Sequence, residues 1–379
     1  MPGLYLHIPF CKQACHYCNF HFSTTLRSKS EMVDALLLEL ELQKNYLPVT
    51  EINTIYFGGG TPSLLELEEL NRIFEKIFAL YQVSSDAEVT LEGNPDDLTR
   101  EKLRDLRAYT PVNRLSIGIQ SFSDEDMHWM NRAHNAKHAH ACLREALAAG
   151  FHDLTIDLIY GAPTTSDAQW AENLHIAFDA GIPHLSCYSL TVEPGTALFH
   201  FVEKGKAAPV DEETASRQFE YLQDAAAMAG YEHYEISNFA LPGRYSRHNS
   251  SYWRGEPYLG VGPSAHSYNG VSRQWNIANN ALYLRAMKAG TIPFEREVLT
   301  PAQRYNEYVM TSLRTIWGCD QRKIESFGEP FSSTFTAGVE ARLIEGTVEL
   351  KDGVYRLTRS GKILADRITA DLFWVDSGK

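Results

Sequence analysis

The first 235 residues alternate short apolar runs with longer segments of helical period. The runs are rich in Val, Ile, Leu, Thr and Tyr and end in polar or glycine-bearing turns, which is typical of buried β-strands. They cover Gly3–Ile8, Ile52–Phe57, Ala87–Glu92, Asn113–Ile119, Asp153–Ile159 and His184–Leu190. Because each run is followed by a helical segment, the pattern predicts a parallel sheet with helical crossovers.

The intervening segments have the spacing of amphipathic helices. Within 67–81, apolar side chains recur three and four residues apart, which predicts one buried stripe. Lys137–Ala149 and 212–228 end at Gly150 and Gly230, the residue type that commonly terminates helices. Six units rather than eight favour a partial (β/α)6 barrel of the TIM type, although a doubly wound sheet fits the same periodicity. In both folds, functional groups gather at the C-terminal ends of the strands.

The pattern changes in the last third of the chain. Residues 236–290 are rich in Tyr, Asn, His and Gly with weak periodicity, which predicts a linking region with extended pieces. Helical runs then return, and two short runs flank Asp352-Gly353, a strong hairpin signal. We therefore expect three parts, 1–235, 236–290 and 291–379, the last a smaller winged-helix-like α+β domain. Residues 301–379 carry 11 basic and 11 acidic side chains, so a structural or lid role is favoured over reading DNA.

The bulk composition adds a few restrictions. The formal net charge of -13 argues against a nucleic-acid partner, because such proteins need basic surface to neutralise phosphates. No apolar run of about 18 residues is present, so no transmembrane segment is expected. The N-terminus lacks the pattern of a secretion signal, and we expect a cytoplasmic protein. Peripheral membrane contact and a homodimer are compatible with the sequence but do not follow from it.

Three of the six cysteines crowd into the loop after the first strand, as Cys11, Cys15 and Cys18. Their spacing is C-x3-C-x2-C. Three thiolates on one loop can each bind one iron of a 4Fe–4S cube and leave the fourth iron open for a ligand. A zinc site completed by a nearby histidine is the alternative. The other cysteines are isolated and are expected to be buried thiols: Cys142, Cys187 and Cys319.

This loop, with the aromatic Tyr17 before its last cysteine, resembles that of the radical SAM superfamily. The resemblance implies that S-adenosylmethionine (SAM) chelates the open iron, and that the reduced cluster cleaves it to a 5′-deoxyadenosyl radical. Gly58-Gly59-Gly60-Thr61 follows the second strand and resembles the superfamily's element that binds the methionine moiety. Glycines there let the backbone approach a ligand closely.

Polar side chains stand at or after the later strand ends. Arg132 can bind the methionine carboxylate with both nitrogens, and Glu92 can pair with the amine. Gln120 and Asp157 can accept from the ribose hydroxyls. Each alone is equally compatible with a structural ion pair, but together they match the SAM-contacting positions of the HemN/HemW family. The SAM set implied by the resemblance is Tyr5, Tyr17, Gly59, Gly60, Thr61, Glu92, Gln120, Arg132 and Asp157.

The linking region contains Arg247-His248-Asn249-Ser250-Ser251-Tyr252-Trp253. It resembles the HNxxYW haem-binding motif of that family's haem chaperones in every fixed position. A neutral imidazole of His248 can bind haem iron axially, and Tyr252 and Trp253 offer flat apolar area to a porphyrin face. His266 is a second candidate for the iron.

Phe20 stands where the family's coproporphyrinogen dehydrogenases carry a further cysteine. Cys11 also lies near the first residue, where those enzymes have an extension. The resemblance therefore implies a haem chaperone that binds a 4Fe–4S cluster, SAM and haem and delivers haem to apoproteins, respiratory ones being expected. It implies no coproporphyrinogen oxidase activity. The alternatives are the oxygen-independent coproporphyrinogen III dehydrogenase and a DNA-binding regulator with a redox-sensing cluster.

Overall fold

The computed structural model describes residues 2–49 and 51–375. All six predicted strands are present and run parallel in chain order. They are β1 (Gly3–Ile8), β2 (Glu51–Gly59), β3 (Gln82–Gly93), β4 (Arg114–Gln120), β5 (Leu154–Tyr160) and β6 (His184–Ser189). The α/β expectation for this part of the chain is confirmed.

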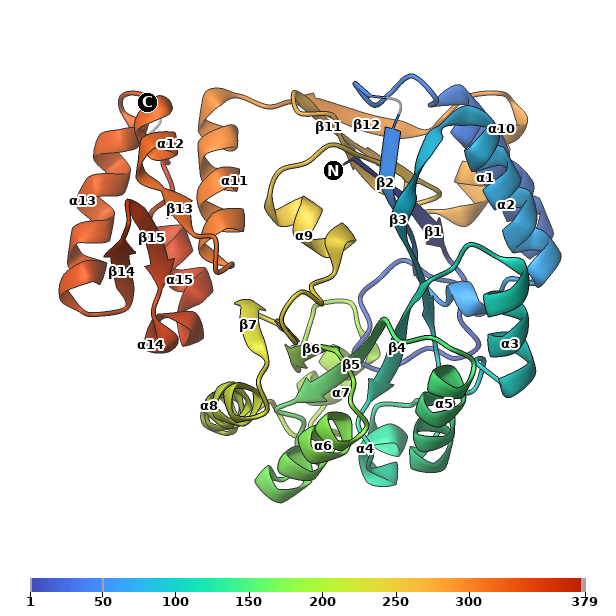
Figure 1. Ribbon diagram of the computed structural model, residues 1–379, viewed down its shortest axis with the longest axis horizontal. Helices are drawn as coiled ribbons and strands as arrows, with labels where there is room; N and C mark the ends of the chain where they lie inside the picture. Colours follow the sequence, from blue (N-terminus) through green and yellow to red (C-terminus); the bar gives the residue numbers. More distant parts are fainter. Residues whose placement is uncertain (1, 50, 376–379) are drawn as a thin grey trace.

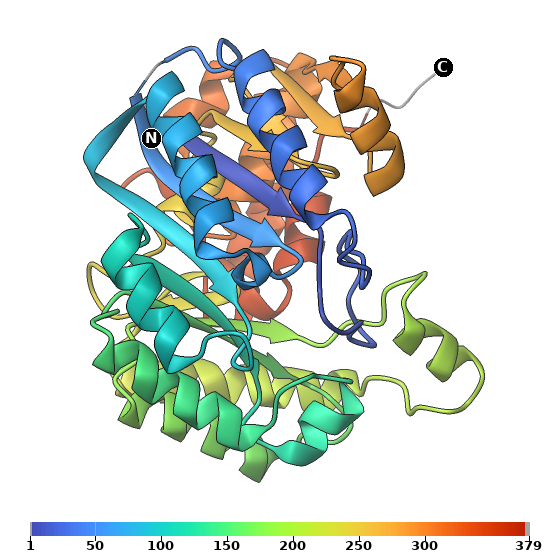
Figure 2. The same ribbon diagram turned by 90° about the vertical axis from the view of Figure 1, so that its right-hand side faces the viewer.

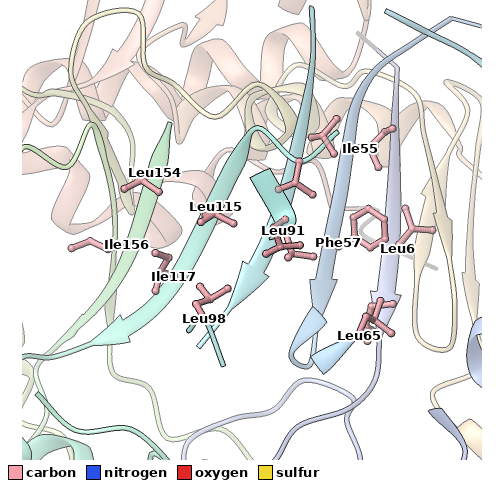
Figure 3. Packing of buried hydrophobic residues seen from close by; sticks show 14 of the residues in the cluster. Leu6, Ile55, Phe57, Leu65, Leu91, Leu98, Leu115, Ile117, Leu154 and Ile156 are labelled. Carbon is pink, nitrogen blue, oxygen red and sulfur yellow. The ribbon is translucent and has the colours of Figure 1, made fainter. Parts of the chain in front are cut away.

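Helices cover the outer face of the sheet (Figure 1 and Figure 2). The larger ones are α1 (Lys29–Leu42), α2 (Leu67–Leu80), α3 (Arg100–Tyr109), α5 (Ala136–Ala148), α6 (Asp167–Asp179) and α8 (Glu212–Met228). Three short helical segments lie in the connections after β4, β6 and β2: α4 (Asp124–Trp129), α7 (Ala197–Glu203) and the 3-10 turn η1 (Pro62–Leu64). The principal core lies between helices and sheet. Figure 3 shows Leu6, Phe57, Leu91 and Leu115 from four adjacent strands in this layer, all fully buried. Burying each such side chain stabilises the fold by about 1.5–3 kcal/mol.

The linking region contains extended pieces, as the sequence predicts, and these pieces pair with the sheet and widen it at both edges. Strand β7 (Glu232–Glu235) precedes this region. The region's own strands are β8 (Asn238–Ala240), β9 (Tyr258–Val261), β10 (His266–Tyr268) and β11 (Ser272–Asn276), and β12 (Phe294–Val298) follows it. The sheet order is β12-β11-β10-β9-β1-β2-β3-β4-β5-β6-β8-β7. Strand β9 pairs parallel with β1, so β1 is an interior strand. The fold is thus a wide, partial barrel with a helical outer layer.

Two helices of the linking region are tied to the barrel by buried carboxylates. Helix α9 (Arg247–Trp253) carries the HNxxYW segment and lies between the barrel and the C-terminal part of the chain (Figure 1). Glu88 in β3 accepts the backbone N–H groups of Arg247 and His248, each at 2.8 Å. Glu39 in α1 accepts from Tyr283 Oη of α10 (Asn280–Lys288) at 2.5 Å.

The C-terminal segment forms a second, smaller core, drawn in orange to red in Figure 1. It contains α11 (Pro301–Leu313), α12 (Gln321–Ser326), α13 (Phe331–Ile344), α14 (Arg359–Ile363) and α15 (Ala365–Asp371). The predicted hairpin is present as β14 (Val348–Lys351) and β15 (Val354–Leu357), with β13 (Cys319–Asp320) as an unforeseen third strand. The expected winged-helix-like α+β arrangement agrees with these elements. The boundary at residue 291 stays a prediction; β12 pairs with β11 in the large sheet.

No helix within residues 2–49 and 51–375 is long and apolar enough to cross a membrane.

Candidate functional site

A cavity of about 380 Å³ opens at the C-terminal ends of the barrel strands, and we call it the strand-end cavity. This is the end where parallel α/β folds place their ligands. The structure brings nearly the whole predicted cysteine and SAM set to its wall: Cys11, Cys15, Cys18, Tyr17, Gly59, Gly60, Thr61, Glu92, Gln120, Arg132 and Asp157. These residues come from six segments that are far apart in sequence.

The cysteine loop is fastened by backbone contacts rather than by regular structure. Asn131, which follows α4, donates from its amide to Ala14 O at 2.7 Å and accepts from Gln13 Nε2 at 2.8 Å. The backbone N–H of His16 donates to Met130 O at 3.1 Å, and its carbonyl oxygen accepts from Leu198 N at 2.7 Å. In Figure 2 the dark-blue loop accordingly lies beside the segment leading to α7. These contacts fix the loop against the turn after α4 and against α7.

Two donors point at the cysteine sulfurs. Thr61 Oγ1 donates to Cys11 Sγ at 3.4 Å, and Arg132 Nη1 lies 3.3 Å from Cys15 Sγ. Such donors favour the thiolate, the form that binds metal. All three cysteines are free and half-buried. Within the described residues they do not converge on a position for one metal ion. A cube, whose irons are each bound by a single cysteine, does not require that convergence.

Asn94, in the turn after Glu92, was not selected from the sequence, yet it joins the two donors. Its Oδ1 accepts from Arg132 Nη2 at 2.6 Å, and its Nδ2 donates to Thr61 Oγ1 at 3.1 Å. Arg132 Nη2 also donates to Gly118 O at 2.9 Å. The guanidinium is thus held by the protein at the mouth of the cavity, with Nη1 toward Cys15.

The glycine turn after β2 packs tightly against the cysteine loop. Gly60 N donates to Ile8 O at 2.9 Å, and a Cβ atom at Gly60 would lie 2.6 Å from Phe10 O. Gly59 has φ +103°, and a Cβ there would meet the His7 ring at 2.5 Å. Only glycine meets both conditions without displacing the backbone.

Two buried carboxyl groups face the cavity from β3 and β5. Burial raises the pKa of Glu92 to about 7, and burial, with the nearby Glu92, raises that of Asp157 to about 7. Glu92 accepts from Tyr56 Oη at 2.6 Å. Neither forms an ion pair with a described residue. A ligand that brings an ammonium group and hydroxyls would supply the missing partners, so this donor set fits SAM.

Two further wall residues have unusual features. Gln120 adopts a left-handed φ of +67°, a conformation that non-glycine residues keep mainly where the surroundings impose it. His134, which sequence reasoning did not select, is 3% exposed, and its Nε2 lies 3.1 Å from Ile119 O. Its buried Nδ1 has no hydrogen-bond partner among the described residues.

Tyr5 is the one member of the predicted SAM set that does not line the strand-end cavity. It lines a second cavity of about 1030 Å³, which lies between the open side of the barrel and the C-terminal segment. Tyr252 and Trp253 of α9 form part of the same wall, with His266 of β10 and Tyr308 of α11. Asn19 and Phe20, directly after the cysteine loop, line both cavities. The two cavities therefore adjoin at that loop.

His248, by contrast, lies behind this wall and is 1% exposed. Its Nδ1 is 2.8 Å from Thr54 Oγ1, and its Nε2 is 2.7 Å from Tyr252 Oη. Its ring stacks on Tyr56 with the centroids 4.9 Å apart. Burial lowers the pKa of the imidazole to about 3, so it is neutral. Binding of iron by His248 would require one of these hydrogen bonds to break.

Comparison with known proteins agrees with this geometry. The family model described as "Radical SAM superfamily" matches residues 5–177. The chain is 34% identical over 375 residues to the "Heme chaperone HemW" of Mycobacterium tuberculosis, covering 98% of this chain and 94% of that protein. It is 32% identical to the protein of the same name from Bacillus subtilis, covering 97% and 98%.

Among solved structures, coproporphyrinogen III oxidase (HemN) from Escherichia coli superposes with a TM-score of 0.84. The match covers 98% of this chain and 90% of HemN at 23% identity, and so it shows a shared fold. The two HemW proteins match over nearly the whole length of both chains, at 34% and 32% identity. This chain belongs to the HemW family of radical SAM proteins.

Proposed function

We propose that this protein is a haem chaperone: it binds haem in the second cavity, close to a 4Fe–4S cluster and SAM, and delivers it to haem-requiring apoproteins. The observation that carries the proposal is that Tyr252 and Trp253 of the HNxxYW segment face a cavity of about 1030 Å³. Ligand cavities commonly measure about 300–1,000 Å³, so this volume lies at the upper end of that range and has room for a large, flat ligand.

The wall of the second cavity has the chemistry that a porphyrin needs. Aromatic side chains offer flat apolar area: Tyr5, Phe20, Tyr252, Trp253, Tyr258, Tyr268, Tyr308, Trp317 and Phe327. Cationic side chains lie on the same wall and suit the two propionates: Arg254, Arg273, Arg304 and Lys323. Arg304 is exposed, and no described residue forms an ion pair with it. The C-terminal segment supplies much of this wall, which gives it a role in haem binding.

At the strand-end cavity we assign the cluster to Cys11, Cys15 and Cys18. When bound, cluster and SAM supply the one-electron chemistry of the superfamily. The protein would contribute position and charge: Arg132 would hold the methionine carboxylate, and Glu92, in its ionised form, would accept from the amine. Asp157 and Gln120 line the part of the cavity assigned to the ribose. Tyr17, Gly59, Gly60 and Thr61 complete that wall, whereas Tyr5 belongs to the haem side.

The test begins with anaerobic reconstitution of the full chain and measurement of iron and acid-labile sulfide. Haem-loaded protein is then mixed with haem-depleted membranes that carry respiratory apocytochromes. The proposal expects the cytochrome spectrum to appear faster than with the same amount of free haem. Equal rates would remove the chaperone function.

The same preparation distinguishes the alternative enzyme. Incubation with coproporphyrinogen III, SAM and a reductant is expected to leave the substrate unchanged. Formation of protoporphyrinogen would identify the protein as the oxygen-independent dehydrogenase instead. Phe20 argues for the first outcome, because it occupies the position of that enzyme's additional cysteine.

A further inference from the structure

Three histidines line the second cavity, and their ring nitrogens differ in the hydrogen bonds that they make. His7 is bonded on both sides, with Nδ1 3.2 Å from Tyr5 Oη and Nε2 3.0 Å from His21 O. His21 Nε2 lies 2.7 Å from Asn280 Oδ1. His266 lines the cavity and is exposed, and no described residue makes a hydrogen bond to either of its ring nitrogens.

His266 sits on a regular element that holds it toward the cavity. It is the first residue of β10 and pairs with Trp275 of the antiparallel strand β11. The two rings stack at a centroid distance of 6.2 Å, nearly in parallel at 27°. Burial, and then the charge of Arg273, lower the pKa of this imidazole, which keeps it in the neutral form that binds iron. A histidine without a protein partner on the wall of an aromatic cavity is available to a ligand.

His248 has the opposite properties. Both ring nitrogens are occupied, the side chain is buried, and it does not line the cavity. Its hydrogen bond to Tyr252 Oη does, however, fix the phenol ring that forms part of the cavity wall. Tyr252 is further held edge-on against Tyr258, with the ring centroids 4.5 Å apart. In this geometry His248 holds the aromatic wall in place, but its own ring is not positioned to bind the metal.

We propose that His266 provides the axial ligand to haem iron in the second cavity, and that His248 is a positioning residue that orients Tyr252 against the porphyrin. The inference rests on the proposed haem-chaperone function and deepens it, because it assigns the iron to a residue outside the HNxxYW segment.

The experiment is an anaerobic haem titration of the reconstituted full chain, followed by absorption and resonance Raman spectra. His266→Ala is expected to lose the histidine–iron stretching band, shift the Soret band and weaken haem binding by about tenfold or more. Added imidazole should restore the wild-type spectrum in His266→Ala, because the truncated side chain leaves room beside the iron. His248→Ala is expected to keep the histidine-ligated spectrum with weaker binding. Tyr252→Phe should resemble His248→Ala.

The inference is overturned if His266→Ala keeps the wild-type spectrum, or if His248→Ala loses it and regains it with imidazole. His21→Ala serves as a matched control on the same wall and should retain the spectrum. Cluster content and thermal unfolding verify that each variant is folded. If wild-type protein takes up no haem at all, the proposed function itself fails, and that result is distinct from a changed ligand.

Discussion

Asn94 Oδ1 accepts a hydrogen bond from Arg132 Nη2 at 2.6 Å, and this contact sets the position of the guanidinium that reaches Cys15. Asn94 lies just beyond β3 and Arg132 just beyond α4, so the contact joins two turns of the barrel rim. Through its other amide atom, Asn94 also holds Thr61, the hydroxyl donor to Cys11. One neutral side chain therefore orients both donors to the cysteine loop.

The amide of Asn94 should be needed for tight binding of SAM. Asn94→Ala should weaken SAM binding by about tenfold, because a hydrogen bond between a neutral and a charged group contributes about 1.5–3 kcal/mol. The cluster should still assemble, since its thiols are unchanged. Equilibrium binding of SAM to the reconstituted protein measures the effect. Asn45→Ala, at an exposed position, is the control. Unchanged SAM affinity in Asn94→Ala would show that Arg132 needs no such support.

The buried carboxyl of Glu92 predicts a pH dependence of stability. Its folded-state pKa of about 7 lies above the ordinary value of 4.5, so the folded chain binds the proton more tightly than the unfolded chain does. The resulting stabilisation is complete below pH 4.5 and is lost as the pH rises through 7, on the order of 3 kcal/mol for this group alone.

Urea unfolding of the apoprotein at pH 5 and pH 8 tests this effect. Glu92→Gln should reduce the loss of stability between the two pH values, whereas Glu68→Gln, on the exposed surface of α2, should not. An identical pH profile in Glu92→Gln and wild type would contradict the prediction. SAM should reverse the trend by binding the ionised carboxyl more tightly at the higher pH.

We expect the stability of the C-terminal segment to depend on one buried ion pair. Arg314 Nε lies 3.0 Å from Glu235 Oε1, and the Glu235 side chain is 1% exposed. The same guanidinium stands over the Trp253 ring, 5.4 Å from its centroid. Arg314→Met would leave a buried carboxylate unpaired, which costs about 3 kcal/mol, and would release Trp253 from one neighbour. Haem affinity should fall together with the free energy of unfolding.

A second ion pair, between α14 of the C-terminal segment and α8, provides the comparison. Arg359 and Asp224 form an ion pair in which both side chains are more than half exposed. Arg359→Met should therefore cost less than about 1 kcal/mol and leave haem affinity unchanged. Urea unfolding curves of the two variants measure the two losses of stability. Equal losses in both would show that burial of Glu235 is not what makes its pair important.

Alanine should be tolerated less well at Gly59, in the glycine turn after β2, than at Gly181. Gly181, which follows α6, also has a positive φ, but nothing lies within 4 Å of a Cβ built there. Gly181→Ala should cost about 1 kcal/mol from backbone strain. Gly59→Ala adds a collision with the His7 ring and should cost more, as well as weakening SAM binding. Thermal unfolding and SAM titration measure both; similar losses would contradict the role given to the turn.

Much of the barrel follows from the sequence, because long parallel strands are apolar on the face that packs against helices. Leu4 and Leu6 alternate with Tyr5 and His7 in β1, and the helices between strands have one apolar stripe each. The strand-end residues follow from the same pattern, since parallel strands place their C-terminal ends at one edge. Asn94 and His134 lie in irregular segments that have no sequence periodicity. The sequence therefore did not identify them as residues of the wall of the strand-end cavity.

The linking region was harder to predict for a physical reason. Strands β9 and β10 are only four and three residues long, and what stabilises them is pairing with β1 and β11 rather than their own periodicity. The direction of His248 is likewise a tertiary effect, set by Thr54 and Tyr252. The motif alone predicted an iron ligand, and Tyr5 was grouped with SAM because it matches a SAM-contacting position of the HemN/HemW family.

The central claim is that haem occupies the second cavity. Thr311 of α11 lines that cavity, and its Oγ1 donates back to Glu307 O at 2.8 Å. Thr336 of α13 makes the equivalent bond to Ser332 O at 2.9 Å on the exposed surface. The most direct measurement is an anaerobic haem titration of Thr311→Trp beside Thr336→Trp. We predict that Thr311→Trp loses haem binding and keeps SAM binding, while Thr336→Trp keeps both; haem affinity equal to wild type in Thr311→Trp would contradict binding of haem in this cavity.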